Sequence, residues 1–238
     1  MSFIAKRLER IKPSPTMAIT AKAAELRAAG RDVIGLGAGE PDFDTPRNIV
    51  DAGVKALGGG FTHYGPSPGL MEVRERIAEE ISRTRNISVA ADNVVITPGG
   101  KPIMFFTILA LVDEGDEVLY PNPGFPIYES MINFVGGVPV PMKLLAERNF
   151  RVDVDEVAGQ ITPRTKLMVI NSPSNPCGSI IEEHDLEALA DLAREHDITV
   201  LSDEIYRRFL YEGEHHSITG FAGMPDQTII LDGFSKTY

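Results

Sequence analysis

Residues 167–206 read LMVINSPSNPCGSIIEEHDLEALADLAREHDITVLSDEIY. Two short apolar runs, residues 167–170 and 199–202, flank an amphipathic segment of helical length at residues 182–196. Short runs rich in apolar and β-branched residues are typical of buried strands, and the apolar spacing between them is typical of a helix. A strand, a helix and a second strand in succession predict two parallel strands joined by a right-handed crossover.

The same alternation continues along most of the chain. Further strands are predicted at residues 94–97, 117–120, 138–140 and 228–231, and further helices at residues 102–112 and 124–135. Strands that alternate with helices predict an α/β fold, in which a mostly parallel sheet carries helices on both faces.

The beginning of the chain has a different pattern. Residues 1–15 are expected to form an extended arm, because Pro13 and Pro15 disfavour a helix there. A helix is predicted at residues 16–29 and a short strand at residues 33–36.

The end of the chain leaves the predicted sheet without a covering element. The last predicted strand ends near Asp232, and the sequence ends at Tyr238. A buried strand is normally followed by an element that covers it or pairs with it. We therefore expect the chain to be the N-terminal portion of a longer protein whose C-terminal part is missing here.

Composition narrows the class of protein. The chain has 238 residues, and its 23 Lys and Arg against 34 Asp and Glu give a net charge of −11, which disfavours nucleic acid or an anionic membrane as partner. A single cysteine, Cys177, excludes an internal disulfide and fits a reducing compartment. Apolar stretches such as residues 103–112 are too short to span a membrane, and the first residues lack the apolar run of a signal peptide. These features predict a cytoplasmic protein.

Unusual loops follow five of the predicted strands. They are PGGK at residues 98–101, PNPGF at 121–125, NSPSNPCG at 171–178, DEIY at 203–206 and DGFSK at 232–236. Ligands of parallel α/β sheets bind beyond the carboxyl ends of the strands. The five loops are therefore expected to form one wall of a single site.

Two of these loops carry groups with reactive chemistry. Lys236 alone is compatible with a lysine that extends to solvent, and Asp203 alone with a residue that caps a turn. Together, an amine and a carboxylate at the ends of neighbouring strands suit a heteroaromatic aldehyde, since a desolvated amine forms imines with carbonyl compounds.

The glycine-rich segments exclude two common nucleotide motifs. Gly99-Gly100-Lys101 could bind an anion at a helix N-terminus, but taken alone it favours an ordinary helix start, and it is not a Walker P-loop. The glycine spacing of residues 35–39 differs from the dinucleotide fingerprint, so a nicotinamide enzyme is weakly supported. The five histidines have no metal-ligand spacing, and we expect no metal.

Several motifs in this order resemble one family. They are GAGEPDF at residues 37–43, YGP at 64–66, GGK at 99–101, NSPSNPCG at 171–178, SDEIY at 202–206 and SK at 235–236. Over essentially its whole length the chain resembles the class I aminotransferases, which are fold-type I pyridoxal-phosphate enzymes, and within them the bacterial aspartate aminotransferase branch. The resemblance implies that residues 1–45 form an N-terminal arm and part of a small domain, and that residues 46–238 form an incomplete cofactor-binding large domain.

The resemblance implies pyridoxal 5'-phosphate as cofactor and assigns residues to it. Lys236 would bind the cofactor covalently and move the substrate proton, Asp203 would pair with the ring nitrogen, and Tyr206 would contact the phenolic oxygen, which makes these three the implied catalytic residues. The other implied cofactor contacts are Asn175 at the phenolic oxygen, Phe125 on the ring, and Gly99, Gly100, Lys101, Ser235 and Tyr64 around the phosphate.

Substrate contacts follow from the same resemblance. Gly39, Phe125 and Asn175 are implied to line the substrate site, and Gly39 would meet the substrate carboxylate through its backbone N–H. Lys101 has a second role open to it, as contact for the distal carboxylate of a dicarboxylic substrate. Lys12 either borders the substrate, in a segment linked to acceptance of prephenate, or is a surface lysine on the arm.

The implied function is transamination between an L-amino acid, aspartate-like or aromatic, and a 2-oxo acid by a ping-pong mechanism. Phe125 stands where aspartate-specific members carry tryptophan, which leaves aromatic substrates open. One alternative is a catalytically incomplete fragment that lacks the substrate-binding arginine, and another is a lyase on the same fold and cofactor. A homodimer is expected, because Tyr64 would reach the phosphate from the neighbouring subunit.

Overall fold

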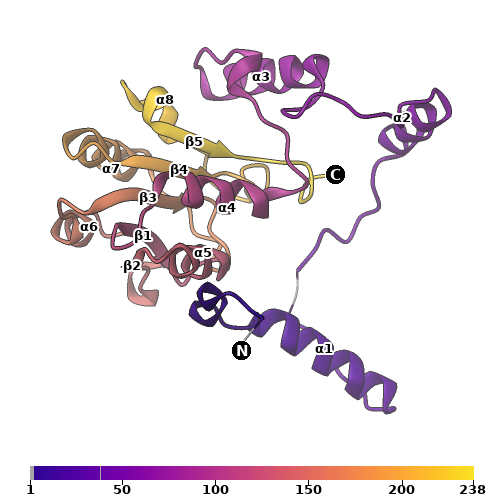
Figure 1. Ribbon diagram of the computed structural model, residues 1–238, viewed down its shortest axis with the longest axis horizontal. Helices are drawn as coiled ribbons and strands as arrows, with labels where there is room; N and C mark the ends of the chain where they lie inside the picture. The colour runs from indigo at the N-terminus through magenta and orange to yellow at the C-terminus, as the bar shows by residue number, and fades with distance from the viewer. Residues whose placement is uncertain (1–2, 38) are drawn as a thin grey trace.

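The structure, a computed structural model, describes residues 3–37 and 39–238, and within these residues five strands form one parallel sheet (Figure 1). The strand order is β2-β1-β3-β4-β5. The strands are β1 (Glu117–Asn122), β2 (Val138–Lys143), β3 (Thr165–Asn171), β4 (Thr199–Asp203) and β5 (Thr228–Leu231). Each contains or coincides with a predicted strand, which confirms the parallel α/β class.

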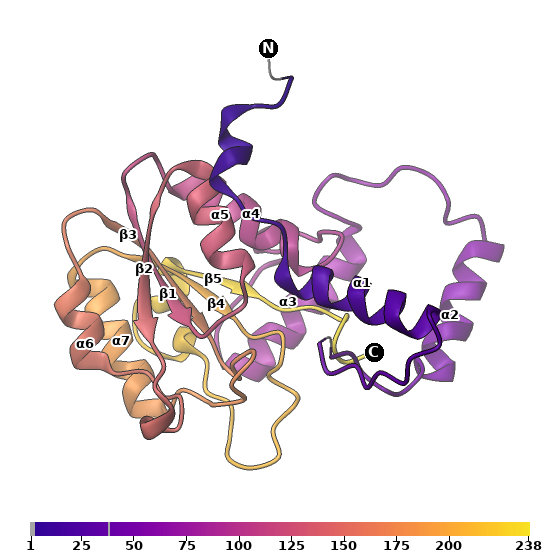
Figure 2. The ribbon, with the colours of Figure 1, turned by 90° about the horizontal axis from the view of Figure 1, so that it is seen from below.

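Helices cover both faces of this sheet (Figure 2). They are α4 (Gly100–Leu111) and α5 (Ile127–Val135) on one face, and α6 (Val154–Gln160), α7 (Glu183–Glu195) and α8 (Met224–Gln227) on the other. An apolar core lies on each face of the sheet, and alternate residues of β3 point into the two cores. Met168 packs in the core that contains Leu189, and Leu167 packs in the core that contains Ile108. Burial of one such side chain contributes about 2 kcal/mol.

The register of the central strands aligns their carboxyl ends. Asn171 of β3 pairs with Asp203 of β4, and Asp203 pairs with Leu231 of β5. These three residues therefore lie at one level, and the loops that follow them leave from the same edge of the sheet.

The N-terminal helices lie beside the sheet and cover neither face (Figures 1 and 2). They are the 3-10 helix η1 (Lys6–Arg10) and the helices α1 (Pro15–Ala28), α2 (Arg47–Gly58) and α3 (Met71–Arg85). No residue of α2 is buried, whereas α3 buries Arg74, Ala78 and Arg85. Three further 3-10 turns are η2 (Ala91–Asn93), η3 (Ala146–Arg148) and η4 (Ile218–Gly220).

The strand expected at residues 94–97 is wrong. Val94 donates its backbone N–H to Ala91 O at 3.0 Å, and Ile96 donates to Pro68 O at 2.9 Å, so no strand among the described residues pairs with this run. A β-branched sequence becomes a strand only where a neighbouring strand offers the ladder of hydrogen bonds.

Two expectations for the arm are also corrected. Residues 33–36 are irregular, and the arm contains η1. Pro15 does not prevent a helix, because it is the first residue of α1, where its missing N–H has no intrahelical partner to lose. Ser14 caps this helix by accepting the N–H of Met17 at 3.4 Å.

The helices of the described residues include no candidate for a membrane span, since none of them combines enough length with enough apolar character.

Candidate active site

Asp203 is the buried centre of the carboxyl edge. It ends β4, and the residue is 2% exposed. Its Oδ2 accepts the hydroxyl of Tyr128 at 2.5 Å, and its Oδ1 accepts the backbone N–H of Ile205 at 3.2 Å. Burial raises the pKa of Asp203 to about 6, although the hydrogen bond from Tyr128 favours the ionised form. Among the described residues, the carboxylate has no ion pair with a basic side chain.

Two tyrosines interact with this carboxylate, and Phe125 packs on one of them. Tyr128 of α5 is fully buried, and burial followed by the charge of Asp203 raises the pKa of its phenol well above the usual value. The pKa of the half-buried Tyr206 is raised by the same two causes in the same order. The ring of Phe125 meets that of Tyr128 edge-on, with centroids 6.0 Å apart. Both phenols therefore stay protonated as donors.

Asn171 connects the loops that follow β3 and β4. Its Nδ2 donates to the backbone carbonyl of Asp203 at 3.0 Å, and its Oδ1 accepts the N–H of Asn175 at 2.8 Å. The side chain of Asn171 thus fixes the start of the NSPSNPCG loop against the end of β4. The half-buried Asn175 is held at this edge by its backbone.

The segment around Gly99 opens α4 at the same edge. Gly99 is the N-cap residue with φ 92°, and the hydroxyl of Thr97 donates to its carbonyl at 2.7 Å. A Cβ added to Gly100 would meet Leu231 at 3.4 Å, so the first turn of α4 lies against the end of β5. The exposed Lys101 follows in this turn. Free N–H groups of a first helical turn bind anions such as phosphate.

The turn after β5 carries Ser235 and Lys236. The backbone N–H groups of Thr237 and Tyr238 both donate to Phe234 O, at 3.0 and 2.9 Å. Ser235 is exposed and Lys236 is half-buried. Within the described residues the amine of Lys236 has no ion pair or hydrogen bond, so neither kind of interaction joins it to Asp203.

The remaining predicted residues lie on the N-terminal segments. Tyr64 is fully exposed in the connection between α2 and α3, outside the sheet. Gly39 and Lys12 are also exposed. The structure thus groups Asp203 with Tyr206 at the sheet edge, and no described hydrogen bond or ion pair joins the N-terminal three to them.

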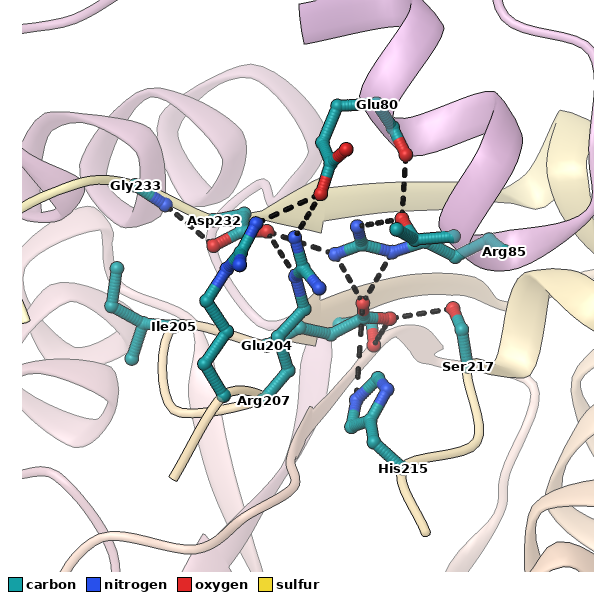
Figure 3. Close-up of polar contacts among 12 residues, drawn as sticks. Glu80, Arg85, Glu204, Ile205, Arg207, His215, Ser217, Asp232 and Gly233 are labelled. Carbon is teal, nitrogen blue, oxygen red and sulfur yellow. Dashed lines mark hydrogen bonds and ion pairs between the residues drawn. The ribbon is translucent and has the colours of Figure 1, made fainter. Parts of the chain in front are cut away.

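An ionic cluster that sequence reasoning missed lies beside the site (Figure 3). We call Glu80, Arg85, Glu204, Arg207 and Asp232 the arginine cluster. Arg207 Nε donates to Asp232 at 2.8 Å, and Arg207 Nη2 donates to Glu80 at 3.2 Å. Burial raises the pKa of Asp232, but the bonds from Arg207 and Arg85 outweigh it and leave that pKa below its usual value.

Tyr128 was missed as well. It stands in the GFPIY segment that follows β1, but nothing in that pattern indicates a partner 75 residues away. Arg85 ends a helix with several other charged residues, so the sequence has no signal that separates it from a surface arginine.

The donor set fits pyridoxal phosphate. Asp203 is a buried carboxylate with acceptor capacity beyond its two hydrogen bonds, which suits a protonated ring nitrogen. The first turn of α4 offers N–H groups to a phosphate, and the half-buried Phe125 offers an aromatic face. Clusters of three or more His, Cys, Asp or Glu with metal-binding geometry are absent from the described residues.

The family model and the two relatives described next are all named as aminotransferases. A family model described as "Aminotransferase class I and II" matches residues 31–238. The aspartate aminotransferase of Bacillus subtilis (strain 168) is 44% identical over 237 residues, which are 99% of this chain and 60% of that protein. The aspartate/prephenate aminotransferase of Thermus thermophilus is 44% identical over 238 residues, covering 100% of this chain and 61% of that protein.

A solved structure gives the same result. The aspartate aminotransferase from Thermus thermophilus with maleate superposes with a TM-score of 0.95 at 44% identity, covering 99% of this chain and 61% of that one. The chain therefore spans about 60% of the length of these relatives.

Proposed function

Because the chain belongs to the class I and II aminotransferase family, we propose that the whole protein is a pyridoxal-phosphate-dependent transaminase. It moves an amino group between an L-amino acid and a 2-oxo acid, and the first product leaves before the second substrate binds. The observation that carries the proposal is Asp203, a buried carboxylate at the carboxyl edge of the sheet with its pKa raised to about 6.

Asp203, Tyr206, Asn175 and Lys236 each have a separate role around the cofactor. Pyridoxal phosphate, when bound, supplies an electron sink for the bond broken at the substrate Cα. Asp203 would hold a proton on the ring nitrogen, and the positive charge there would favour the ionised form of the Asp203 carboxylate. Tyr206 donates a hydrogen bond to the phenolic oxygen, next to the amide of Asn175. Lys236 would hold the cofactor through its amine. Once the substrate amine has displaced it, the freed amine of Lys236 would accept the proton from the substrate Cα.

Other residues bind and orient. Phe125 would stack on the ring. The start of α4, at Gly99, Gly100 and Lys101, would hold the phosphate together with Ser235. This arrangement is supported by Gly100, which lies against Leu231 at the end of β5. The loop that carries Ser235 begins at the next residue, Asp232.

The favoured substrate is a dicarboxylic amino acid such as aspartate. Aromatic amino acids or prephenate are the second choice. Gly39 contacts the substrate carboxylate through its backbone N–H, and Asn175 lines the substrate site. Lys101 contacts the distal carboxylate, and Lys12 borders the substrate. The names of the relatives, which include aspartate and aspartate/prephenate aminotransferases, support this order. Phe125, where aspartate-specific members carry tryptophan, argues against strict specificity for aspartate.

The organisation of the whole protein belongs to the same proposal. Residues 1–45 form an arm and part of a small domain, residues 46–238 form the large domain, and the protein works as a homodimer in the cytoplasm. The full exposure of Tyr64 supports a role at a neighbouring subunit.

A half-reaction tests the function. The full-length protein loaded with pyridoxal phosphate is incubated with aspartate, and oxaloacetate and the amine form of the cofactor are measured. Both are expected in equal amounts. Release of ammonia or carbon dioxide in their place would identify a lyase on the same fold.

A further inference from the structure

Arg85 joins three parts of the chain that are distant in sequence (Figure 3). It is the last residue of α3, and its side chain is 1% exposed. Its Nε and Nη2 donate to Oε2 of Glu204 at 2.9 and 2.8 Å, and Nη2 also donates to Oδ2 of Asp232 at 2.9 Å. One guanidinium therefore connects α3 with the ends of both β4 and β5.

These two ends carry the proposed catalytic groups. Glu204 directly follows Asp203, and its N–H donates to Leu231 O at 2.8 Å. Asp232 directly follows β5, and its Oδ1 accepts the N–H of Gly233 at 2.7 Å, at the start of the loop that leads to Lys236. Arg85 does not contact Asp203 itself, because Asp203 turns to Tyr128 while the next side chain turns to the arginine cluster.

The pocket around Glu204 is built for a charged carboxylate. Its Oε1 accepts the hydroxyls of Ser202 at 3.0 Å and Ser217 at 2.6 Å, and the residue is 2% exposed. A buried ion pair is seldom worth more than an apolar pair of the same volume, whereas loss of one partner leaves a costly buried charge. Arg85 is thus better explained by what it positions than by its contribution to stability.

We propose that Arg85 is a positioning residue for Asp203: it locks the ends of β4 and β5 together and neutralises the carboxylates beside the site. The inference rests on the proposed function only for the role of Asp203 toward the cofactor, since the arrangement itself involves this chain alone.

The charges near Asp203 predict the direction in which its proton affinity changes when Arg85 is removed. The titratable groups that act on Asp203 are Tyr128 from α5, Tyr206 and Glu204 from the loop after β4, and Asp232 from the end of β5. The charges of Glu204 and Asp232 both raise the pKa of Asp203. Removal of Arg85 uncovers these charges and strengthens proton binding at Asp203, whereas opening of the β4 end to water would weaken it.

The test is a pH titration of the Asp203 carboxyl carbon by NMR, in cofactor-free protein labelled with ¹³C at aspartate. Asp203→Asn assigns the signal. Arg85→Gln is expected to raise the proton affinity of Asp203 about three- to tenfold. Arg85→Gln/Glu204→Gln, which removes both charges, is expected to return it to within about twofold of the original. Arg76→Gln is the matched control, because Arg76 lies on α3 with its side chain 80% exposed.

An unchanged proton affinity in Arg85→Gln overturns the proposal. A lower proton affinity overturns its electrostatic part, because Arg85 would then act on Asp203 only by closing the β4 end. If that variant fails to fold, Glu204→Gln decides alone, since it keeps the Arg85 bond to Asp232 and is expected to lower the proton affinity of Asp203 about threefold. No change in Glu204→Gln would equally overturn the proposal. Pyridoxal phosphate binding is measured in parallel, and its absence in the parent protein would contradict the proposed function without altering the Asp203 titration.

Discussion

The hydroxyl of Tyr128 donates a 2.5 Å hydrogen bond to Oδ2 of Asp203, and this contact joins α5 to the end of β4. Both residues are buried, so the bond replaces water at a charged group. A hydrogen bond to an ionised group contributes about 1.5–3 kcal/mol. The contact therefore matters both for stability and for the ionisation of Asp203.

Tyr128→Phe is expected to lower the free energy of unfolding by about 1.5–3 kcal/mol at pH 8, where Asp203 is ionised, and by less at pH 4. Urea unfolding at the two pH values measures both losses. Tyr211→Phe is the control, since Tyr211 is 98% exposed and its change should have no effect. An equal loss at both pH values for Tyr128→Phe would mean that the phenol does not interact with the charge.

Asp203→Asn is expected to change how stability depends on pH. The pKa of Asp203 is about 6 in the folded chain against an ordinary value of 3.8, so its contribution is fully present below pH 3.8 and is lost as the pH rises through 6. The loss amounts to about 3 kcal/mol, because each pKa unit corresponds to about 1.4 kcal/mol. Relative to the parent protein, Asp203→Asn should therefore gain stability between pH 4 and pH 8.

Urea unfolding across this pH range checks the difference between the two proteins. Asp226→Asn serves as control because Asp226 is exposed and should leave the pH dependence as it is. A constant difference between Asp203→Asn and the parent protein at every pH would contradict the raised pKa.

Lys236→Ala is expected to abolish covalent attachment of the cofactor in the full-length protein. After incubation with pyridoxal phosphate and borohydride, mass spectrometry should find a reduced adduct in the parent protein and none in this variant. Lys166→Ala is matched to it, since Lys166 is an exposed lysine of β3, and it should keep the adduct. An adduct that survives in Lys236→Ala would assign the attachment to another residue.

Gly99→Ala and Gly53→Ala are expected to have opposite effects on stability. A Cβ added at either position meets no atom within 4 Å, so backbone conformation decides. Gly99 has φ 92°, where alanine costs about 1 kcal/mol or more, whereas Gly53 lies inside α2, where alanine gains about 0.5–1 kcal/mol. Thermal unfolding compares the two, and a Gly99→Ala variant as stable as the parent protein would show that the α4 start can adopt another conformation.

Local patterns predicted most of the sheet because they depend on neighbouring residues only. The apolar runs within β1, β3 and β4 are bounded by turn residues, and the helical period between β3 and β4 is regular across α7. Residues 94–97 carry the same kind of run but form no strand, because pairing requires a partner strand that no local pattern specifies.

The position of some candidate site residues follows from the same local patterns, while their roles stay predictions. Asp203 is the last residue of β4 and Tyr206 lies in the loop that follows, so the end of one predicted strand locates both. The role of Lys236 stays a prediction, since no described hydrogen bond or ion pair connects it with Asp203.

What the sequence by itself determined was the α/β alternation and the identity of the loops at the carboxyl edge, because hydrophobic period and turn residues act over a few positions. Only the tertiary structure decided which groups set the ionisation of Asp203. Tyr128 is 75 residues away from it, and Arg85 reaches the adjacent Glu204 across 119 residues. Such partners are chosen by how helices pack on the sheet and by the cost of burying an unpaired charge, and both exist only once the chain has folded.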